Sequence, residues 1–314
     1  MGYVLTFENG KPLDIHELID VRDFDYSNLQ WISYVRTETI VEKLPEFIQK
    51  SRRFTEDLLE DQRPRFQDYS SLAPGKDRFK VAIFKFITRS IFETDEFELQ
   101  LSILLTEETI ITITNKETPV LLDIMSKIRL RNESMNRNRI LSLILDELVE
   151  EGIEIIERLE NELELMEKRQ LSWDFDPNWL PRLTDLKGRV YTANRSVRAD
   201  VEVIRDMQKD IELRNTSFEH TEDRLLFLLD LLDFQRDNMN NIVNLHLTLS
   251  SQKRAEAMDR LTIIGSLLVI PTVIAGLFGM NVPLPPLDFY DILWLTLALM
   301  VVTAFGIRLI LPKV

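Results

Sequence analysis

The chain lacks cysteine altogether and has fewer basic than acidic residues. Its 314 residues include no Cys, and 52 Asp and Glu outnumber 38 Lys and Arg, which gives a net charge of -14. Without cysteine, the chain forms neither disulfides nor thiolate metal sites. An acidic chain also lacks the basic surface that nucleic-acid binding requires, so we expect no nucleic-acid partner. Its excess of negative charge favours cations instead.

The chain also offers little for catalysis. Its three histidines, His16, His220 and His246, are scattered, and no nucleophile motif accompanies them. Only nine glycines are present, and none belongs to a phosphate-binding loop. We therefore expect no enzymatic activity and no organic cofactor.

Two long apolar runs stand near the C-terminus. Residues 261–280 contain no charged side chain, and as a helix they would extend roughly 30 Å, the thickness of a bilayer's hydrocarbon core. A second run, residues 292–307, follows a proline-rich loop. This pattern predicts a transmembrane hairpin in residues 261–314, with spans at about 261–280 and 291–310.

Basic residues at the outer ends of the hairpin predict its orientation. Lys253, Arg254 and Arg260 precede the first span, Arg308 and Lys313 close the second, and the loop between them has no Lys or Arg. Because cytoplasmic flanks are enriched in Lys and Arg, we expect both termini in the cytoplasm of a cell-membrane protein.

The first part of the chain, residues 1–135, reads as a cytoplasmic α/β domain. Short runs rich in β-branched and aromatic residues predict strands, and two segments with plausible caps predict helices. The expected strands are 3–7, 31–36, 79–87, 99–105 and 109–115, and the expected helices are 37–50 and 54–61.

Residues 136–260 read as a cytoplasmic helical hairpin followed by a stalk helix. Apolar residues at three-to-four spacing predict two helices within 139–215, interrupted near two prolines, and a third that runs from about 216 into the membrane to 280. The first helix carries ten acidic residues between Asp146 and Glu167, which form either a solvated face or a cation-attracting surface. The predicted fold class is thus an α+β domain with a long helical hairpin and a stalk helix, followed by two C-terminal transmembrane helices.

Small residues follow one side of the first span at helical spacing. This stripe indicates either close helix–helix packing or a narrow axial passage made by several copies of the helix. Two spans cannot enclose a pore alone, so the second interpretation requires a ring of protomers. The stripe consists of Thr262, Gly265, Val269, Thr272, Gly276 and Gly279.

Two motifs in this order and topology resemble those of one transporter family. The sequence Phe278-Gly279-Met280-Asn281 ends the first span, and residues 56–65 read EDLLEDQRPR. Together with the two-span layout, they resemble the CorA-type magnesium transporters, the family of metal-ion transporters with a Gly-Met-Asn motif. The resemblance covers the whole chain.

The resemblance implies a homopentamer in the lipid bilayer that conducts Mg²⁺, with Co²⁺ and Ni²⁺ as further candidate ions. The first spans would form an axial pore, and the Asn281 amides at its mouth would bind the hydrated ion. The implied selectivity mouth is Gly279, Met280 and Asn281. The implied pore-lining residues are Met258, Leu261, Gly265, Val269, Thr272 and Gly276.

The resemblance also implies feedback, in which cytoplasmic Mg²⁺ bridges carboxylates of neighbouring subunits and closes the pore. Glu56 and Asp57 match the acidic pair on one side of that bridge, although salt bridges to nearby arginines would explain them equally well. Their partner in the family is an aspartate, and here alignment from the Gly-Met-Asn motif places His220. His is a poor ligand for Mg²⁺, so the bridge would need a carboxylate from elsewhere. Glu219, Glu222 and Asp223 are the candidates near this position.

Two other functions remain open at this point. A zinc transporter similar to ZntB would share the architecture, but that branch usually has Val or Ile where Met280 stands. A membrane-anchored coiled-coil sensor without transport would explain the stalk helix and the hairpin, but it gives no reason for the Gly-Met-Asn motif.

Overall fold

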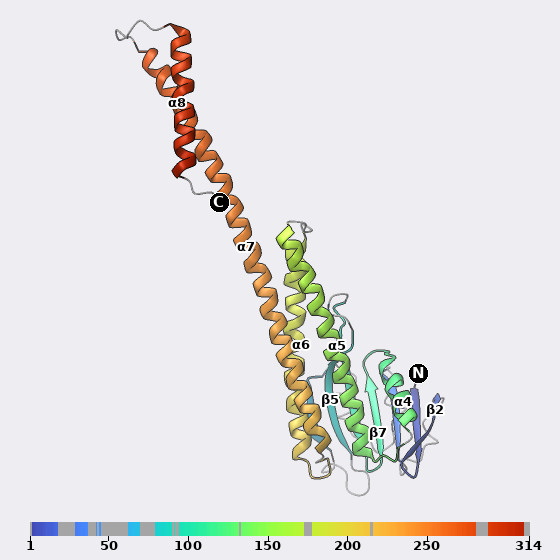
Figure 1. Ribbon diagram of the computed structural model, residues 1–314. Helices are drawn as coiled ribbons and strands as arrows, with labels where there is room; N and C mark the ends of the chain where they lie inside the picture. Colours follow the sequence, from blue (N-terminus) through green and yellow to red (C-terminus); the bar gives the residue numbers. More distant parts are fainter. Residues whose placement is uncertain are drawn as a thin grey trace. The chain divides into compact units, whose positions relative to one another are not determined.

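The computed structural model describes residues 2–17, 29–36, 42, 44, 62–69, 79–89, 91, 94–131, 133–172, 178–213, 216–280 and 288–310. It divides into two compact units, a first unit of Met1–Ile242 and a second unit of Val243–Val314. The helix α7 (Thr216–Phe278) runs through both units without interruption (Figure 1).

The first unit contains a seven-stranded sheet in the order β2-β1-β3-β7-β6-β5-β4 (Figure 1). Neighbouring strands are antiparallel except for β3 and β7, which are parallel. The strands are β1 (Gly2–Glu8), β2 (Lys11–Glu17), β3 (Gln30–Val35), β4 (Arg65–Asp68), β5 (Lys80–Ile87), β6 (Glu98–Leu105) and β7 (Thr109–Thr114).

A two-residue turn joins β1 to β2. Asn9 and Gly10 both have positive φ, 51° and 78°, the conformation of a tight hairpin turn that favours an Asn-Gly pair. Glycine suits the second position for a further reason, because a Cβ there would lie 2.8 Å from the backbone carbonyl oxygen of Met135. The sequence of this turn therefore sets the register in which Glu8 faces Lys11.

The central strands are buried on both faces. All six residues of β7 are buried, and Trp31 in β3 donates a 3.0 Å hydrogen bond from Nε1 to Thr112 Oγ1 of β7. The helix α4 (Val120–Arg131) contacts β1 and β2, α5 (Arg137–Ser172) contacts β5 and β7, and α6 (Trp179–Lys209) contacts β4 and β5. The long helices α5 and α6 thus pack against the sheet (Figure 1).

Polar contacts fix how the three long helices of the first unit align. Lys187 Nζ of α6 donates to Asn240 Oδ1 of α7 at 2.6 Å, and Arg205 Nε donates to Glu222 Oε1 at 2.7 Å. The later residue of α6 thus pairs with the earlier residue of α7, so these two helices are antiparallel. Thr221 of α7 binds Asp146 of α5 at 2.6 Å and Arg224 binds Glu150, so α5 and α7 are parallel.

Most of the predicted elements are confirmed. All five expected strands are present, as are the helical hairpin and the continuous stalk helix. The structure adds β2, β4 and α4, which the apolar pattern did not predict. The expected helices at 37–50 and 54–61 lie outside the described residues, except for positions 42 and 44.

Two helix ends differ from the prediction. The apolar spacing of the second hairpin helix predicts that this helix includes Ile211. The helix α6 instead stops at Lys209, and Ile211 is 94% exposed in the following turn. The helix α7 stops at Phe278, because the Met280 N–H turns to the carbonyl of Leu277, three residues back, at 3.3 Å. The first span therefore ends two residues earlier than expected.

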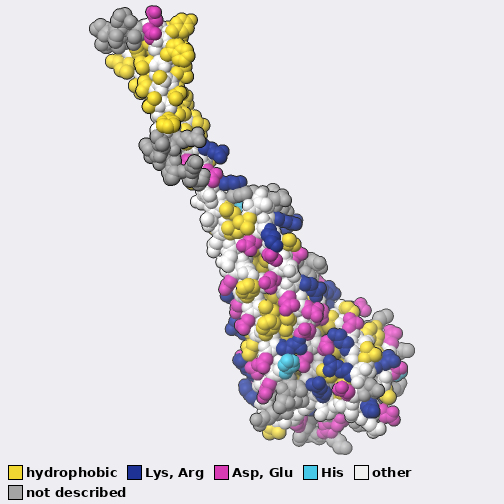
Figure 2. Space-filling view, viewed as in Figure 1, with side chains coloured by type: hydrophobic (Ala, Val, Ile, Leu, Met, Phe, Trp, Pro, Cys, Tyr) yellow, Lys and Arg dark blue, Asp and Glu magenta, His cyan; other side chains and the backbone are white. Residues whose placement is uncertain are grey.

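The second unit holds the C-terminal part of α7 and the helix α8 (Phe289–Ile310). Both helices are long and apolar enough to cross a membrane, and none of the residues in their most apolar windows is buried. Figure 2 shows hydrophobic side chains covering this part of the chain, in contrast to the mixed charges of the first unit. Such uninterrupted exposed apolar surface fits a lipid environment.

Candidate functional site

The predicted pore-lining residues share one exposed stripe of α7. Each has a largely exposed side chain or, for glycine, backbone, and they repeat at the three-to-four spacing of a helix face. No charged residue interrupts the stripe between Leu261 and Gly276. Its described members are Met258, Leu261, Gly265, Val269, Thr272 and Gly276, and Gly279 follows the helix.

A different stripe of α7 is half-covered and consists mainly of large residues. A similar half-covered stripe on α8 indicates that the two helices pack through these faces and leave the small-residue stripe free. On α7 the half-covered residues are Ile263, Leu267, Ile270, Pro271, Ile274 and Phe278. On α8 they are Ile292, Thr296, Met300, Thr303 and Gly306.

The hydroxyl groups on the span donate their protons within the helix, so toward groups outside the helix they can act only as acceptors. Thr272 Oγ1 donates to the carbonyl of Leu268 at 2.8 Å, and Ser266 Oγ donates to Thr262 in the same way. A hydroxyl has one proton, so each oxygen then presents only acceptor lone pairs to its surroundings. Thr272 thus offers an oxygen acceptor to a cation or to the water that hydrates it.

The described residues include two members of the predicted selectivity mouth, Gly279 and Met280. Gly279 donates to the carbonyl of Ala275 at 2.9 Å, and Met280 follows with 56% of its surface exposed. A Cβ on Gly279 would lie 3.1 Å from the same carbonyl, so glycine suits this close turn. Asn281 lies outside the described residues, as do Glu56 and Asp57.

The candidate regulatory residues of α7 lie on its exposed side. Glu219, His220 and Asp223 are all exposed. His220 borders a cleft of about 410 Å³ between α7 and the first turns of α5, together with Arg131, Arg139, Leu143, Asp146, Glu147, Glu150 and Arg224.

The charges of this cleft do not suit a divalent cation. Its acidic groups already have partners: Asp146 accepts from Thr221, Glu147 pairs with Arg131 at 3.8 Å, and Glu150 pairs with Arg224. Among the described residues, no group of three or more His, Asp or Glu side chains could hold a metal ion. Glu219, His220 and Asp223 therefore form no metal site within this part of the chain.

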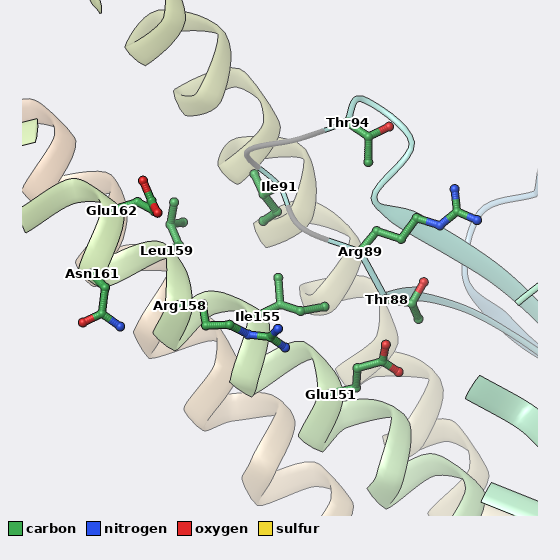
Figure 3. Close-up of a pocket in the computed structure, with 10 residues that line it drawn as sticks. All are labelled: Thr88, Arg89, Ile91, Thr94, Glu151, Ile155, Arg158, Leu159, Asn161 and Glu162. Atoms are coloured by element: carbon green, nitrogen blue, oxygen red, sulfur yellow. The ribbon is translucent and has the colours of Figure 1, made fainter. Parts of the chain in front are cut away.

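A cleft of about 970 Å³ lies between α5 and the segment after β5 (Figure 3). Ile91, Ile155 and Leu159 supply apolar surface, and the carboxylate of Glu151 is directed toward Thr88 (Figure 3). Burial, reinforced by the nearby carboxylate of Glu154, raises the pKa of Glu151 to about 7. Glu151 thus changes charge near neutral pH, which the sequence did not indicate.

Asp200 of α6, which is fully buried against the sheet, was not predicted from the sequence either. The two oxygens of its carboxylate lie 3.0 and 3.3 Å from the backbone nitrogen of Lys85 in β5 and accept a hydrogen bond from that N–H. The pairing of β4 with β5 ends at Ile83, two residues before Lys85. Burial raises the pKa of Asp200 well above its ordinary value, and this hydrogen bond offsets the effect only in part. An acid between Val197 and Ile204 on an otherwise apolar helix face was the available signal.

The fold and the exposed stripe together define a class of protein. A sheet-and-helix unit continues through one unbroken helix into an apolar two-helix hairpin. The accessible face of that hairpin presents small residues and oxygen acceptors. This is the architecture of a membrane protein with two C-terminal spans.

The sequence profile of the CorA-like Mg²⁺ transporter proteins matches residues 48–313. The chain therefore belongs to this family, and it is a membrane protein and a divalent-cation transporter. One relative is the cobalt/magnesium transport protein CorA of Thermotoga maritima, which is 23% identical over 296 residues, covering 90% of this chain and 81% of the relative.

Solved structures support the same fold. The CorA magnesium transporter of Methanocaldococcus jannaschii superposes with a TM-score of 0.76 at 22% identity, over 99% of this chain and 96% of the other. The cytoplasmic domain of ZntB from Vibrio parahaemolyticus superposes with a TM-score of 0.59 at 13% identity, over 80% of this chain and 98% of that domain. The predicted family and fold class are thus confirmed.

Proposed function

We propose that the protein is a Mg²⁺ channel, with Co²⁺ and Ni²⁺ as further candidate ions, formed by a ring of five identical chains. The observation that carries the proposal is the free small-residue stripe of α7, which stays exposed after α8 has packed against a different face. When several copies of α7 surround an axis, this stripe can face inward and line a narrow passage.

The chemistry of the stripe suits a hydrated cation. Thr272 presents an oxygen acceptor, and Gly265 and Gly276 leave space beside it because no neighbouring atom lies within 4 Å of where their Cβ would stand. Met258 and Leu261, at the beginning of the span, are apolar and 61% and 62% exposed. A ring of these two residues would close the passage by excluding water.

The selectivity mouth is assigned to Gly279, Met280 and Asn281. Mg²⁺ gives up its water reluctantly, so a ring of Asn281 amide oxygens would accept hydrogen bonds from the hydrated ion rather than replace its water. Such a ring favours a strongly hydrated divalent cation without using carboxylates.

The assembly would place residues 1–135 and 136–260 in the cytoplasm and residues 261–314 in the lipid bilayer, with both termini on the cytoplasmic side. The support is the distribution of basic residues around the spans: Lys253, Arg254 and Arg260 precede the first, and Arg308 follows the apolar core of the second. Transport in this arrangement requires no organic cofactor and no catalytic residue.

Two alternatives make different predictions. A zinc transporter similar to ZntB is supported by the fold of that protein's cytoplasmic domain, and a non-transporting coiled-coil sensor by the long helix α7. The test is the flux of Mg²⁺, Co²⁺ and Zn²⁺, measured in turn with purified protein in liposomes. We expect Mg²⁺ flux; flux of Zn²⁺ alone would support the first alternative, and no flux of any ion would support the second.

A further inference from the structure

The helices α5 and α6 pack against two different faces of α7. Thr221 and Arg224 of α7 bind α5, whereas Glu222 and Asn240 bind α6. At about 3.6 residues per turn, these two faces of α7 point roughly 120° apart. The side of α5 and the side of α6 that border α7 are called their flanks here, and these two flanks lie on different sides of α7.

The flank of α6 carries a basic patch, defined here as Tyr191, Arg195 and Arg198. These residues are four and three positions apart, so they share one helix face. Tyr191 is 68% exposed, and both arginines are exposed. Within the described chain neither arginine side chain has a hydrogen-bond or ion-pair partner. Exposed Tyr and Arg together are characteristic of protein interfaces.

The flank of α5 carries an acidic patch, defined here as Glu157 and Glu160. Both side chains are exposed, and among the described residues neither has an ion-pair partner. Their neighbour Glu164 differs, because Lys168 neutralises it at 2.7 Å. The acidic patch is thus a local excess of negative charge, of opposite sign to the basic patch.

The two patches lie at the same height along the hairpin. Glu157 precedes the end of α5 at Ser172 by about four helical turns, and Arg195 follows the start of α6 at Trp179 by about as many. At ~1.5 Å per residue, both are roughly 23 Å from these helix ends, Ser172 of α5 and Trp179 of α6. A rotation about an axis parallel to the helices does not move a residue along that axis. Such a rotation can therefore place the basic patch of one copy beside the acidic patch of another.

We propose that the basic patch of one copy binds the acidic patch of the next copy in the ring. Such a head-to-tail contact between unlike surfaces closes into a ring when the rotation allows it. The inference rests on the proposed channel assembly and adds a second contact to it, outside the stripe of α7. Because α7 separates the two flanks, the patches of a single copy do not pair with each other.

Disulfide cross-linking tests the contact directly, because the natural chain has no cysteine. We expect the double variant Glu157→Cys with Arg195→Cys, oxidised mildly in membranes, to give covalent dimers and larger oligomers on a reducing-agent-free gel. The matched control is Glu157→Cys with Arg182→Cys, because Arg182 is exposed but lies roughly 20 Å nearer the start of α6 than Arg195 does. A disulfide requires Cβ atoms about 4 Å apart, so the control should not cross-link.

A charge swap identifies the partner as a second copy. The variant Arg195→Glu with Arg198→Glu should dissociate on dilution at a roughly fivefold higher concentration than the natural oligomer, measured by mass photometry in detergent. Adding Glu157→Arg and Glu160→Arg to the same chain should restore association. An intact oligomer with neither cross-link nor rescue overturns this inference alone, whereas a natural chain that is monomeric overturns the proposed channel.

Discussion

Thr221 Oγ1 donates a 2.6 Å hydrogen bond to Asp146 Oδ1, and this contact between α7 and α5 leaves the adjacent His220 exposed on the outer side of the bundle. The position that the family resemblance assigns to an aspartate therefore faces outward, as a bridge between subunits would require. It carries an imidazole instead of a carboxylate, however, and it borders a cleft with three arginines.

We predict that Mg²⁺ protects the first unit from proteolysis only weakly, and that His220→Asp increases this protection. A carboxylate supplies the oxygen ligand that Mg²⁺ prefers, which imidazole does not. The measurement is limited proteolysis of the full-length protein with and without Mg²⁺, with His220→Asn as the uncharged control. Strong Mg²⁺ protection of the natural chain would contradict this prediction.

We expect Thr272→Val to lower Mg²⁺ flux in liposomes by about two- to tenfold, the effect of losing one hydrogen-bonding group. The change removes the oxygen acceptor from the exposed stripe but keeps the shape of the side chain. It should not break the helix, because the hydroxyl bonds only to its own helix at Leu268. The matched control is Thr296→Val on α8, whose hydroxyl makes the same kind of bond in the half-covered stripe. Equal loss of flux in both variants would argue against a pore-lining role.

We expect Asp200→Asn to flatten the pH dependence of stability. Because the native pKa of Asp200 is raised, the folded protein keeps a proton that the unfolded chain has released, so the free energy of unfolding falls as pH rises above the ordinary Asp pKa. Asparagine does not titrate, and its side-chain oxygen can still accept from the Lys85 N–H. Thermal unfolding should therefore show Asp200→Asn more stable than the natural chain at pH 8 and nearly equal at pH 4.

The exposed Asp185 supplies the control for this experiment. Its side chain is 62% exposed and pairs with Arg189 at 2.7 Å, so Asp185→Asn should leave the pH slope unchanged. A pH slope in Asp200→Asn as steep as that of the natural chain would show that another group is responsible.

We predict that Lys80→Met destabilises the first unit by about 1–3 kcal/mol. Lys80 Nζ lies 2.7 Å from both Asp210 Oδ1 and Glu212 Oε2, which belong to the turn between α6 and α7. Its removal leaves the largely buried carboxylate of Asp210 without a cation. Chemical denaturation followed by circular dichroism measures the effect, and Lys209→Met, which breaks an exposed pair with Asp206, should change little. Equal stability of the two variants would contradict the prediction.

The strands that the sequence predicted are those with buried residues on both faces. Runs such as 79–87 and 109–115 are rich in β-branched and aromatic residues, so their pattern is unambiguous. The overlooked strands, β2 and β4, are the two edges of the sheet, and they carry polar residues such as Lys11 and Asp68. Charged side chains protect edges from aggregation, and they also erase the apolar signal.

For the candidate site, the sequence predicted which residues share a helix face but not how the helices pack. The helical spacing correctly placed Met258 through Gly276 on one face of α7, because a helix repeats in the same way in any environment. Spacing could not show which face α8 covers, nor that Glu151 and Asp200 are buried, because these depend on packing between distant segments. The roles of Asn281, Glu56 and Asp57 remain predictions.

The central claim is that Asn281 selects the ion at the mouth of the pore. The most direct test is Mg²⁺ flux into liposomes by Asn281→Ala, with the oligomer checked by mass photometry. We predict that flux falls to the level of empty liposomes while the oligomer stays intact, because alanine cannot accept hydrogen bonds from the hydrated ion. Flux equal to that of the natural chain, carried by an intact oligomer, would contradict the account.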